Sequence, residues 1–278
     1  MRTRSILRRA GFSIGLAVVI AAAPGSTAAT NAQTQPPYSA SPIPAVAFTD
    51  CVESIGVTLA PTATVRAYVP DQFILAGDGQ PLTPLVVRTA QCGGIATADH
   101  KPKAGEIVQI GAVIIPPDFT GDINNYTIWY YTSDAKLAVE LRQAGLDAQH
   151  VPTIDYHYAD DCFFNVDVPK PGTPKFDLLG TVQPSPEPAG SFLANWWQQT
   201  PAGIIKMATN VSLIKIGGAN LTLTTEPGSL LGQLIDGSST GFPIIQQFNT
   251  FGAAQMVVKL TGGVFTGQLA SRGRQVWR

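Results

Sequence analysis

Residues 125–152 read NYTIWYYTSDAKLAVELRQAGLDAQHVP, and their periodicity changes at Ser133. The first eight residues are aromatic, β-branched or small polar residues, which favours a strand. Ser133 is a residue type that caps helices, Asp134 then falls in the first turn, and Gly145 is suited to end the helix. An apolar stripe with helical spacing is formed by Leu137, Ala138, Leu141 and Ala144. The stretch therefore predicts a strand followed by one amphipathic helix.

Further strand-like runs lie on both sides of this unit, each bounded by glycine or proline. They are residues 84–92, 106–115, 153–159, 162–168, 176–182, 192–198, 204–210, 219–225 and 255–261. Two more short helices are expected, at 62–67 and at 227–237. So many short strands favour a closed barrel or a double-layer sheet, because closure removes exposed strand edges. We predict a mostly β protein with an antiparallel sheet of this kind, a few short helices and a single domain over 48–262.

The composition excludes several classes of protein. The chain has 278 residues, of which 45% are hydrophobic and 13% charged, so it is not a long disordered chain. Residues 1–29 hold four arginines, and without them 14 basic residues face 19 acidic ones. That excess of acid argues against a nucleic-acid partner, which needs a basic face. The motifs GxSxG, GxGxxG, HExxH and the P-loop do not occur.

The amino terminus has the pattern of a secretory signal peptide. Four arginines precede the apolar run 11–23, and small residues follow it. Thirteen apolar residues are too few to span a bilayer as a helix. We expect cleavage after Ala29, with Ala32 as the alternative, and a secreted or periplasmic protein without stable membrane insertion. Residues 30–47 read as a linker rich in Pro, Ser, Thr and Ala, and residues 263–278 as a basic tail.

Three cysteines would enter an oxidising compartment, so one disulfide and one remaining thiol are expected. Three pairings are possible. We favour Cys51–Cys92, because Cys92 lies at a strand end, and we interpret Cys162 as a buried residue of a strand. No CxxC is present and the three histidines are scattered, so we expect neither a metal site nor a cofactor.

Three polar residues are the first candidates for a site. Glu106 shares a strand face with three apolar residues, so its carboxylate is either buried, and then functional or paired, or placed at the exposed start of the strand. Arg142 lies near the end of the predicted helix, where a cation is also favoured by the helix dipole. His150 follows that helix and is of the residue type most suited to proton transfer, although a histidine there is often only a surface or hydrogen-bonded residue. Trp196 and Trp197, adjacent on a strand, should point to opposite faces.

The order of several motifs resembles the acetoacetate decarboxylase superfamily. The segments are VRAYVPDQFILAG (65–77), LVVRTAQC (85–92), KAGEIVQIGAVIIPP (103–117) and the strand–helix unit at 125–152. The resemblance covers about residues 60–155 and implies an acetoacetate decarboxylase-like fold. It also implies that Glu106 matches the family's active-site glutamate and Arg142 its helix arginine.

The family's chemistry depends on a lysine that forms a Schiff base with a β-keto acid. Counted along this sequence, the positions of the family's lysine pair hold Gln149 and His150, and neither forms a stable imine. The resemblance therefore implies a retained pocket without the decarboxylase nucleophile. If an imine does form, Lys206 is the first candidate, provided that its strand face lies inside the barrel.

Two function classes follow. One is an enzyme on a small oxo or carboxylic compound, a lyase or hydrolase in which Glu106 and His150 act as acid and base while Arg142 and Gln149 bind substrate. The other is an extracellular protein that binds a small ligand without chemistry. A small molecule is the expected partner in both, and the oligomeric state stays open.

Overall fold

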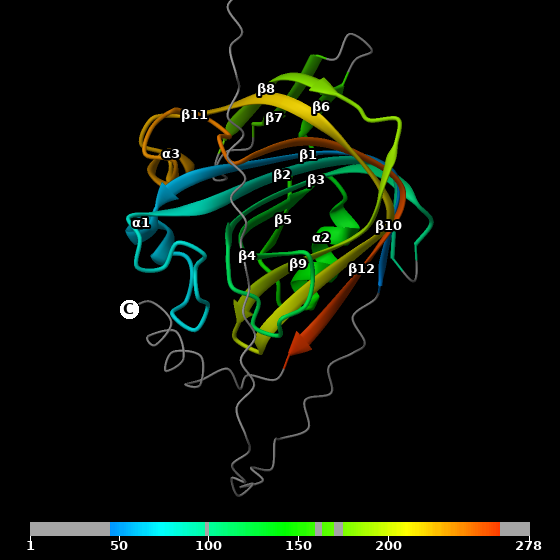
Figure 1. Cartoon of the computed structure of the whole chain (residues 1–278). Helices are drawn as coiled ribbons and strands as arrows, with labels where there is room; N and C mark the ends of the chain where they lie inside the picture. The colour runs from blue at the N-terminus through cyan, green and yellow to red at the C-terminus, as the bar shows by residue number, and fades with distance from the viewer. Residues whose placement is uncertain (1–44, 98–99, 159–162, 170–174, 262–278) are drawn as a thin grey trace, which may run out of the picture. The chain divides into compact units, whose positions relative to one another are not determined.

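The computed structural model describes residues 45–97, 100–158, 163–169 and 175–261, which belong to one compact unit (Figure 1). The predicted signal peptide, its cleavage position, Cys162, the basic tail and nearly all of the linker lie outside the described residues. None of the described helices is long and apolar enough to cross a bilayer.

Seven strands close into a mixed barrel. Around the ring they are β12 (Ile245–Thr261), β1 (Val46–Pro61), β2 (Leu82–Ala96), β3 (Lys103–Val113), β4 (Ile123–Thr132), β9 (Pro188–Thr200) and β10 (Gly203–Thr225), which pairs again with β12. Every pair is antiparallel except β4–β9. The predicted fold class, a closed and mostly antiparallel sheet with few short helices, is confirmed.

The remaining strands extend the sheet beyond the ring. The far half of β10 pairs with β8 (Phe176–Gln183), which continues through β7 (Phe163–Val168) to β6 (Asp155–Tyr158). Two three-residue strands complete the sheet, β11 (Ser239–Gly241) beside β10 and β5 (Ala148–His150) beside β4. β5 runs parallel to β4, because helix α2 carries the chain back across the end of the barrel.

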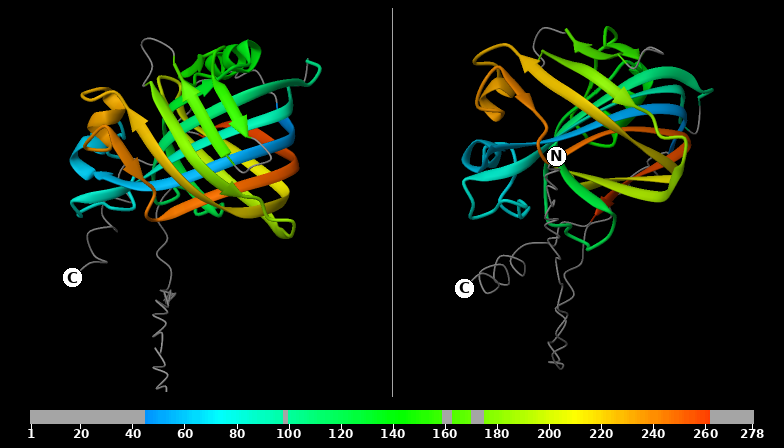
Figure 2. Two further views of the ribbon diagram at one scale, coloured as in Figure 1. Left: turned by 90° about the horizontal axis from the view of Figure 1, so that it is seen from above. Right: turned by 45° about the horizontal axis from the view of Figure 1, so that its top comes forward.

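Each barrel strand buries residues on both faces, and the two faces belong to separate apolar clusters. The inner cluster joins Met207 and Trp196 to Leu137 and Leu141 of α2, which lies at one end of the barrel (Figures 1 and 2). The outer cluster lies between the barrel wall and the covering segments, including β7 and β8. Trp197 belongs to the outer cluster, so the two tryptophans lie on opposite faces as predicted, and both are buried.

The three described helices are short: α1 (Thr62–Arg66), α2 (Ala135–Gln143) and α3 (Leu230–Leu234). All three lie where helices were predicted, but the cap of α2 differs from the prediction. Asp134, not Ser133, is the cap, because its carboxylate accepts the backbone N–H groups of Lys136 and Leu137 at 2.8 Å. The Ser133 hydroxyl is therefore left for another partner.

Two long strands differ from the prediction. β1 was not predicted, and it begins at Val46, inside the expected linker. At Asp50, which has a φ of 52°, its pairing with both neighbouring strands skips one residue. The runs 204–210 and 219–225 are parts of the single strand β10. The Cys51–Cys92 disulfide is present, between directly opposed residues of β1 and β2 with Cα atoms 4.0 Å apart.

Candidate functional site

Glu106 lies near the start of β3 and is held by Ser133, two residues before α2. The Ser133 hydroxyl donates to one carboxylate oxygen of Glu106 and accepts the Glu106 backbone N–H at 2.8 Å. The Gln91 amide donates to the other oxygen at 3.3 Å. Glu106 is half-buried, so this carboxylate combines partial access with fixed hydrogen bonds. The prediction left open whether Glu106 is paired or exposed, and in the structure it is paired.

His150 reaches the same residue from β5. Its Nε2 lies 3.1 Å from the Ser133 carbonyl oxygen, an acceptor, so this nitrogen carries the proton in that hydrogen bond. Gln149 precedes it and lies opposite Tyr131 of β4. Glu106 and His150 thus meet at Ser133, at one end of the barrel. The histidine contacts the backbone of Ser133 and the glutamate its hydroxyl, so the three do not form a nucleophile–base–acid relay.

Arg142 lies at the other end of α2. Its guanidinium donates to the Ala148 carbonyl at 2.9 Å, and the residue is exposed. This bond fixes the turn between α2 and β5. The contacts of Arg142 in the structure therefore serve the turn and do not reach the Glu106–Ser133 pair.

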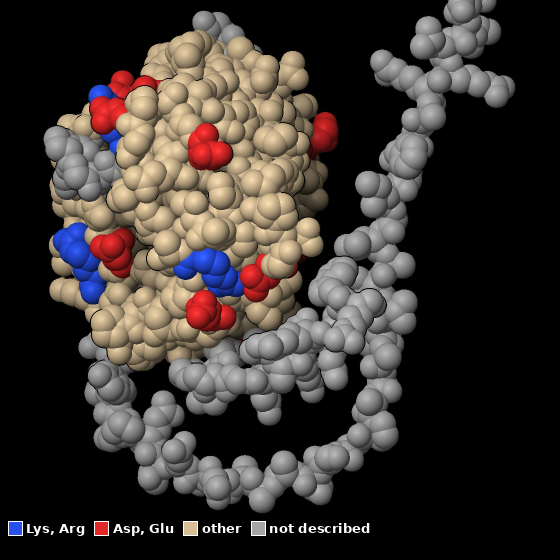
Figure 3. Space-filling view, turned by 90° about the vertical axis from the view of Figure 1, so that its left-hand side faces the viewer, with Lys and Arg blue, Asp and Glu red and all other residues tan. Residues whose placement is uncertain are grey.

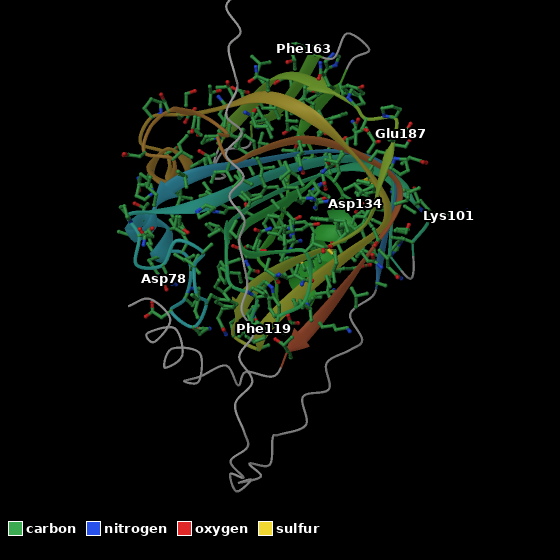
Figure 4. The ribbon with its side chains drawn as sticks, in the orientation of Figure 1. Asp78, Lys101, Phe119, Asp134, Phe163 and Glu187 are labelled. Carbon is green, nitrogen blue, oxygen red and sulfur yellow. A yellow bond between two sulfur atoms is a disulfide. The ribbon has the colours of Figure 1, made fainter. Side chains whose placement is uncertain are left out.

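A cavity of about 580 Å³ opens beside Ser133, at the amino end of α2. Three lysines line it: Lys101 before β3, Lys103 at the first position of β3, and Lys136 in the first turn of α2. Figure 4 labels Asp134 at the start of α2 and Lys101 in the connection between β2 and β3. The Asp134 carboxylate is the acidic group of the lining, and it is engaged in capping the helix.

The charges around this cavity are partly balanced. Glu140 lies 4.0 Å from the Lys136 ammonium and 3.8 Å from the His100 ring, and it accepts the Thr97 hydroxyl. Among the described residues, Lys101 and Lys103 form no ion pair. The two lysines are exposed at the cavity, where their ammonium groups favour an anion.

Lys206 is the buried lysine of the described chain, and it lies on the outer face of β10, opposite Trp197. Its ammonium lies 2.6 Å from both the Asp118 carboxylate and the Thr120 hydroxyl, and 5.0 Å from the centre of the Trp197 ring. Burial alone would raise the pKa of Asp118, but hydrogen bonds from Lys206 and Thr120 outweigh it and hold that pKa below its usual value. Lys206 therefore lies in an ion pair on the outer face of β10 and not inside the barrel, where a lysine would have to lie to be the expected imine candidate.

Sequence reasoning missed a polar network on the inner face of the barrel. Arg88 donates to Glu53 and to Gln109, both at 2.5 Å, and the Asn249 amide donates to the other Glu53 oxygen at 3.1 Å. Glu53, Gln109 and Asn249 are almost fully buried, whereas 13% of the Arg88 side chain is exposed. Four strands contribute one residue each, so no local pattern marks the network.

Charge elsewhere on the surface gives little indication of a partner. On the face in Figure 3, the basic residues lie beside acidic ones in small mixed groups, other acidic residues stand alone, and uncharged surface separates them. This pattern does not provide the basic band that a nucleic acid requires on that face.

Comparisons with known proteins identify the fold. No family model and no curated protein matches the sequence. Among solved structures, one described as "Structural Studies of Acetoacetate Decarboxylase" aligns with a TM-score of 0.55 at 8% identity, covering 78% of this chain and 88% of that one. The enduracididine biosynthesis enzyme MppR, complexed with the condensation product of pyruvate and imidazole 4-carboxaldehyde, aligns with a TM-score of 0.52 at 12% identity, covering 80% of this chain and 90% of that one. The same enzyme complexed with pyruvate gives 0.51, at 13% identity and with coverage of 80% and 91%.

Proposed function

The chain has the acetoacetate decarboxylase-like fold, and we propose that it binds a small oxo or carboxylic acid in the cavity at the amino end of α2. The observation that carries the proposal is the cavity lining, in which Lys101 and Lys103 lack ion-pair partners among the described residues beside a capped helix terminus. A carboxylate placed there gains two ammonium groups without displacing an existing ion pair. MppR, which shares the fold, is described in complex with pyruvate, a ligand of this chemical class.

The binding proposal is tested by titrating the purified chain with pyruvate and with acetoacetate in a calorimeter. Replacing Lys101 and Lys103 together with alanine removes two charges near the ligand, and we expect at least tenfold weaker binding. Lys259→Ala is the matched control, because Lys259 is exposed on the outer face of β12. Equal affinities for the double variant, the control and the unaltered chain would reject this cavity as the site.

A second candidate function is proton transfer to a bound oxo acid. The observation that favours it is the meeting of Glu106 and His150 at Ser133, which also lines the cavity. Deuterium exchange at the methyl group of pyruvate, followed by NMR in D₂O, reports proton abstraction beside the carbonyl. Catalysis predicts accelerated exchange that Glu106→Gln abolishes while pyruvate binding persists. Binding without acceleration would leave the chain a binding protein.

We further propose that the chain acts without a Schiff base and is exported. The position of Lys206 on the outer face of β10, in an ion pair with Asp118, supports the first part. The Cys51–Cys92 bond and the pattern of residues 1–29 support the second, because disulfides persist in oxidising compartments. Mass spectrometry of the chain recovered outside the cytoplasm should show a start near Thr30. A secreted form that still begins at Met1 would contradict cleavage.

A further inference from the structure

We infer that the lysine-lined cavity at the amino end of α2 binds its anion more tightly when His100 is protonated. The inference rests on the proposed function, because it concerns the regulation of the same site. His100 lies in the connection between β2 and β3, and it lines the cavity together with Lys101 and Lys136. Its backbone N–H donates to the Thr97 carbonyl at 3.0 Å, which fixes it beside the end of β2. A change in the charge of its ring therefore acts directly on a bound anion.

His100 turns its Nε2 atom inward, toward Glu140 of α2. This nitrogen lies 3.8 Å from Oε1 of Glu140, although 37% of the His100 side chain is exposed. In the described part of the chain, both Nε2 of His100 and Oε2 of Glu140 are buried without a hydrogen-bond partner. Buried polar groups in folded proteins are nearly always paired. A proton on Nε2 would let the ring donate to the carboxylate, and the two residues would then form a charge-assisted hydrogen bond.

Lys136 competes with His100 for the same carboxylate. Its ammonium lies 4.0 Å from Oε1 of Glu140, one helical turn away, and the Thr97 hydroxyl donates to that oxygen at 2.9 Å. While His100 is neutral, the negative charge of Glu140 attracts Lys136 and opposes an anion in the cavity. Protonation of His100 offsets the charge of Glu140. The Lys136 ammonium is then available to the anion, and the cavity gains one positive charge.

The residue types around the cavity make a histidine the expected source of a pH dependence. Histidine is the side-chain type that ordinarily changes its charge between about pH 5 and pH 8. The other charged groups that line the cavity or contact His100 are lysines and carboxylates from the β2–β3 connection, the start of β3, and α2 with its cap. They are Lys101, Lys103, Asp134, Lys136 and Glu140. Binding of an anion should therefore strengthen as the pH falls through this range, because the added proton carries a positive charge.

Calorimetric titration of the full chain with pyruvate at pH 5.5 and at pH 8 tests the inference. The pyruvate carboxylate stays ionised at both values, so the difference reports on the protein. We expect binding about fivefold tighter at pH 5.5, because one unit charge is added beside the cavity in a partly solvated position. His100→Gln should bind with the weaker affinity at both pH values. Glu140→Gln should bind more tightly than the unaltered chain at pH 8, because it removes the negative charge that opposes the anion.

The other two histidines supply the controls. His157→Gln is the matched variant, because His157 is exposed on β6 and does not line the cavity, and it should keep the full difference between the two pH values. His150 lies near the cavity through its contact with the Ser133 carbonyl. A difference that persists in His100→Gln and disappears in His150→Gln would overturn the inference. Equal affinity of the unaltered chain at both pH values would also overturn it, while leaving the proposed function intact. An absence of pyruvate binding at both values would reject the proposed function, and this regulation with it.

Discussion

Reduction of the Cys51–Cys92 bond should lower the stability of the barrel by about 4 kcal/mol. The two residues are 41 positions apart, and closing a loop of that length removes about 13 cal/mol/K of chain entropy from the unfolded state. Multiplied by 298 K, this gives about 4 kcal/mol. Globular domains are stable by only about 5–15 kcal/mol, so the loss is large.

Urea unfolding, followed by tryptophan fluorescence with and without dithiothreitol, measures how much the disulfide contributes to stability. Both samples should carry Cys162→Ser, so that no third thiol exchanges with the bond. With an unfolding slope of about 3 kcal/mol/M, the midpoint should fall by more than 1 M on reduction. Reduction changes no side-chain volume, unlike a Cys→Ala pair, so packing defects do not contribute. A midpoint that moves by less than about 0.3 M would refute the entropic argument for this bond.

Three further predictions concern packing, charge and chemistry. Gly111→Ala would place a Cβ atom 2.7 Å from Trp196 and 2.2 Å from a backbone oxygen, so thermal unfolding should show a loss of stability of about 1–3 kcal/mol. Gly237→Ala is the control and should show no such loss, because open space surrounds that position. The pKa of Asp118 is lowered in the folded chain, so its pairing with Lys206 contributes stability above pH 4 that is lost as the pH falls further. Lys206→Met should therefore flatten the dependence of the unfolding free energy between pH 5 and pH 3, and an unchanged slope would contradict the pairing. Borohydride treatment with acetoacetate should add no mass to the chain, and an adduct on any lysine would restore the Schiff-base mechanism.

Periodicity predicted most of the strands but not their extent, for identifiable reasons. Glu53 is a charged residue on an inward-facing position of β1, so the strand does not show the apolar alternation that would reveal it. Its charge is matched by Arg88, which lies on another strand. In β10, Gly217 and Gly218 indicate a turn, yet the strand continues through them. The glycines are needed there because a neighbouring strand lies too close for a side chain: a Cβ at Gly217 would lie 2.1 Å from a backbone oxygen of Gln183.

The candidate site was predictable where its parts are close in sequence. The alternation of residues 106–115 brought attention to Glu106, and the strand–helix unit at 125–152 to Arg142 and His150, but the helix length separates the arginine from the other two. The sequence alone indicated Ser133 as the helix cap. Asp134 beside it is an equally good capping residue, and only the fold decides between the two. Lys101 and Lys103, two of the three lysines that line the cavity, are exposed residues where the connection between β2 and β3 meets β3, and sequence patterns carry no signal there.

The single parallel pairing in the ring has a consequence for how the barrel opens. β1 is held to β12 by an eleven-pair register, whereas β4 meets β9 over four residue pairs only. Amide hydrogens of β4 and β9 beyond Tyr126 should therefore exchange with solvent earlier than those of β1 and β2. The ring can therefore open locally between β4 and β9 while its other six strand pairings stay intact.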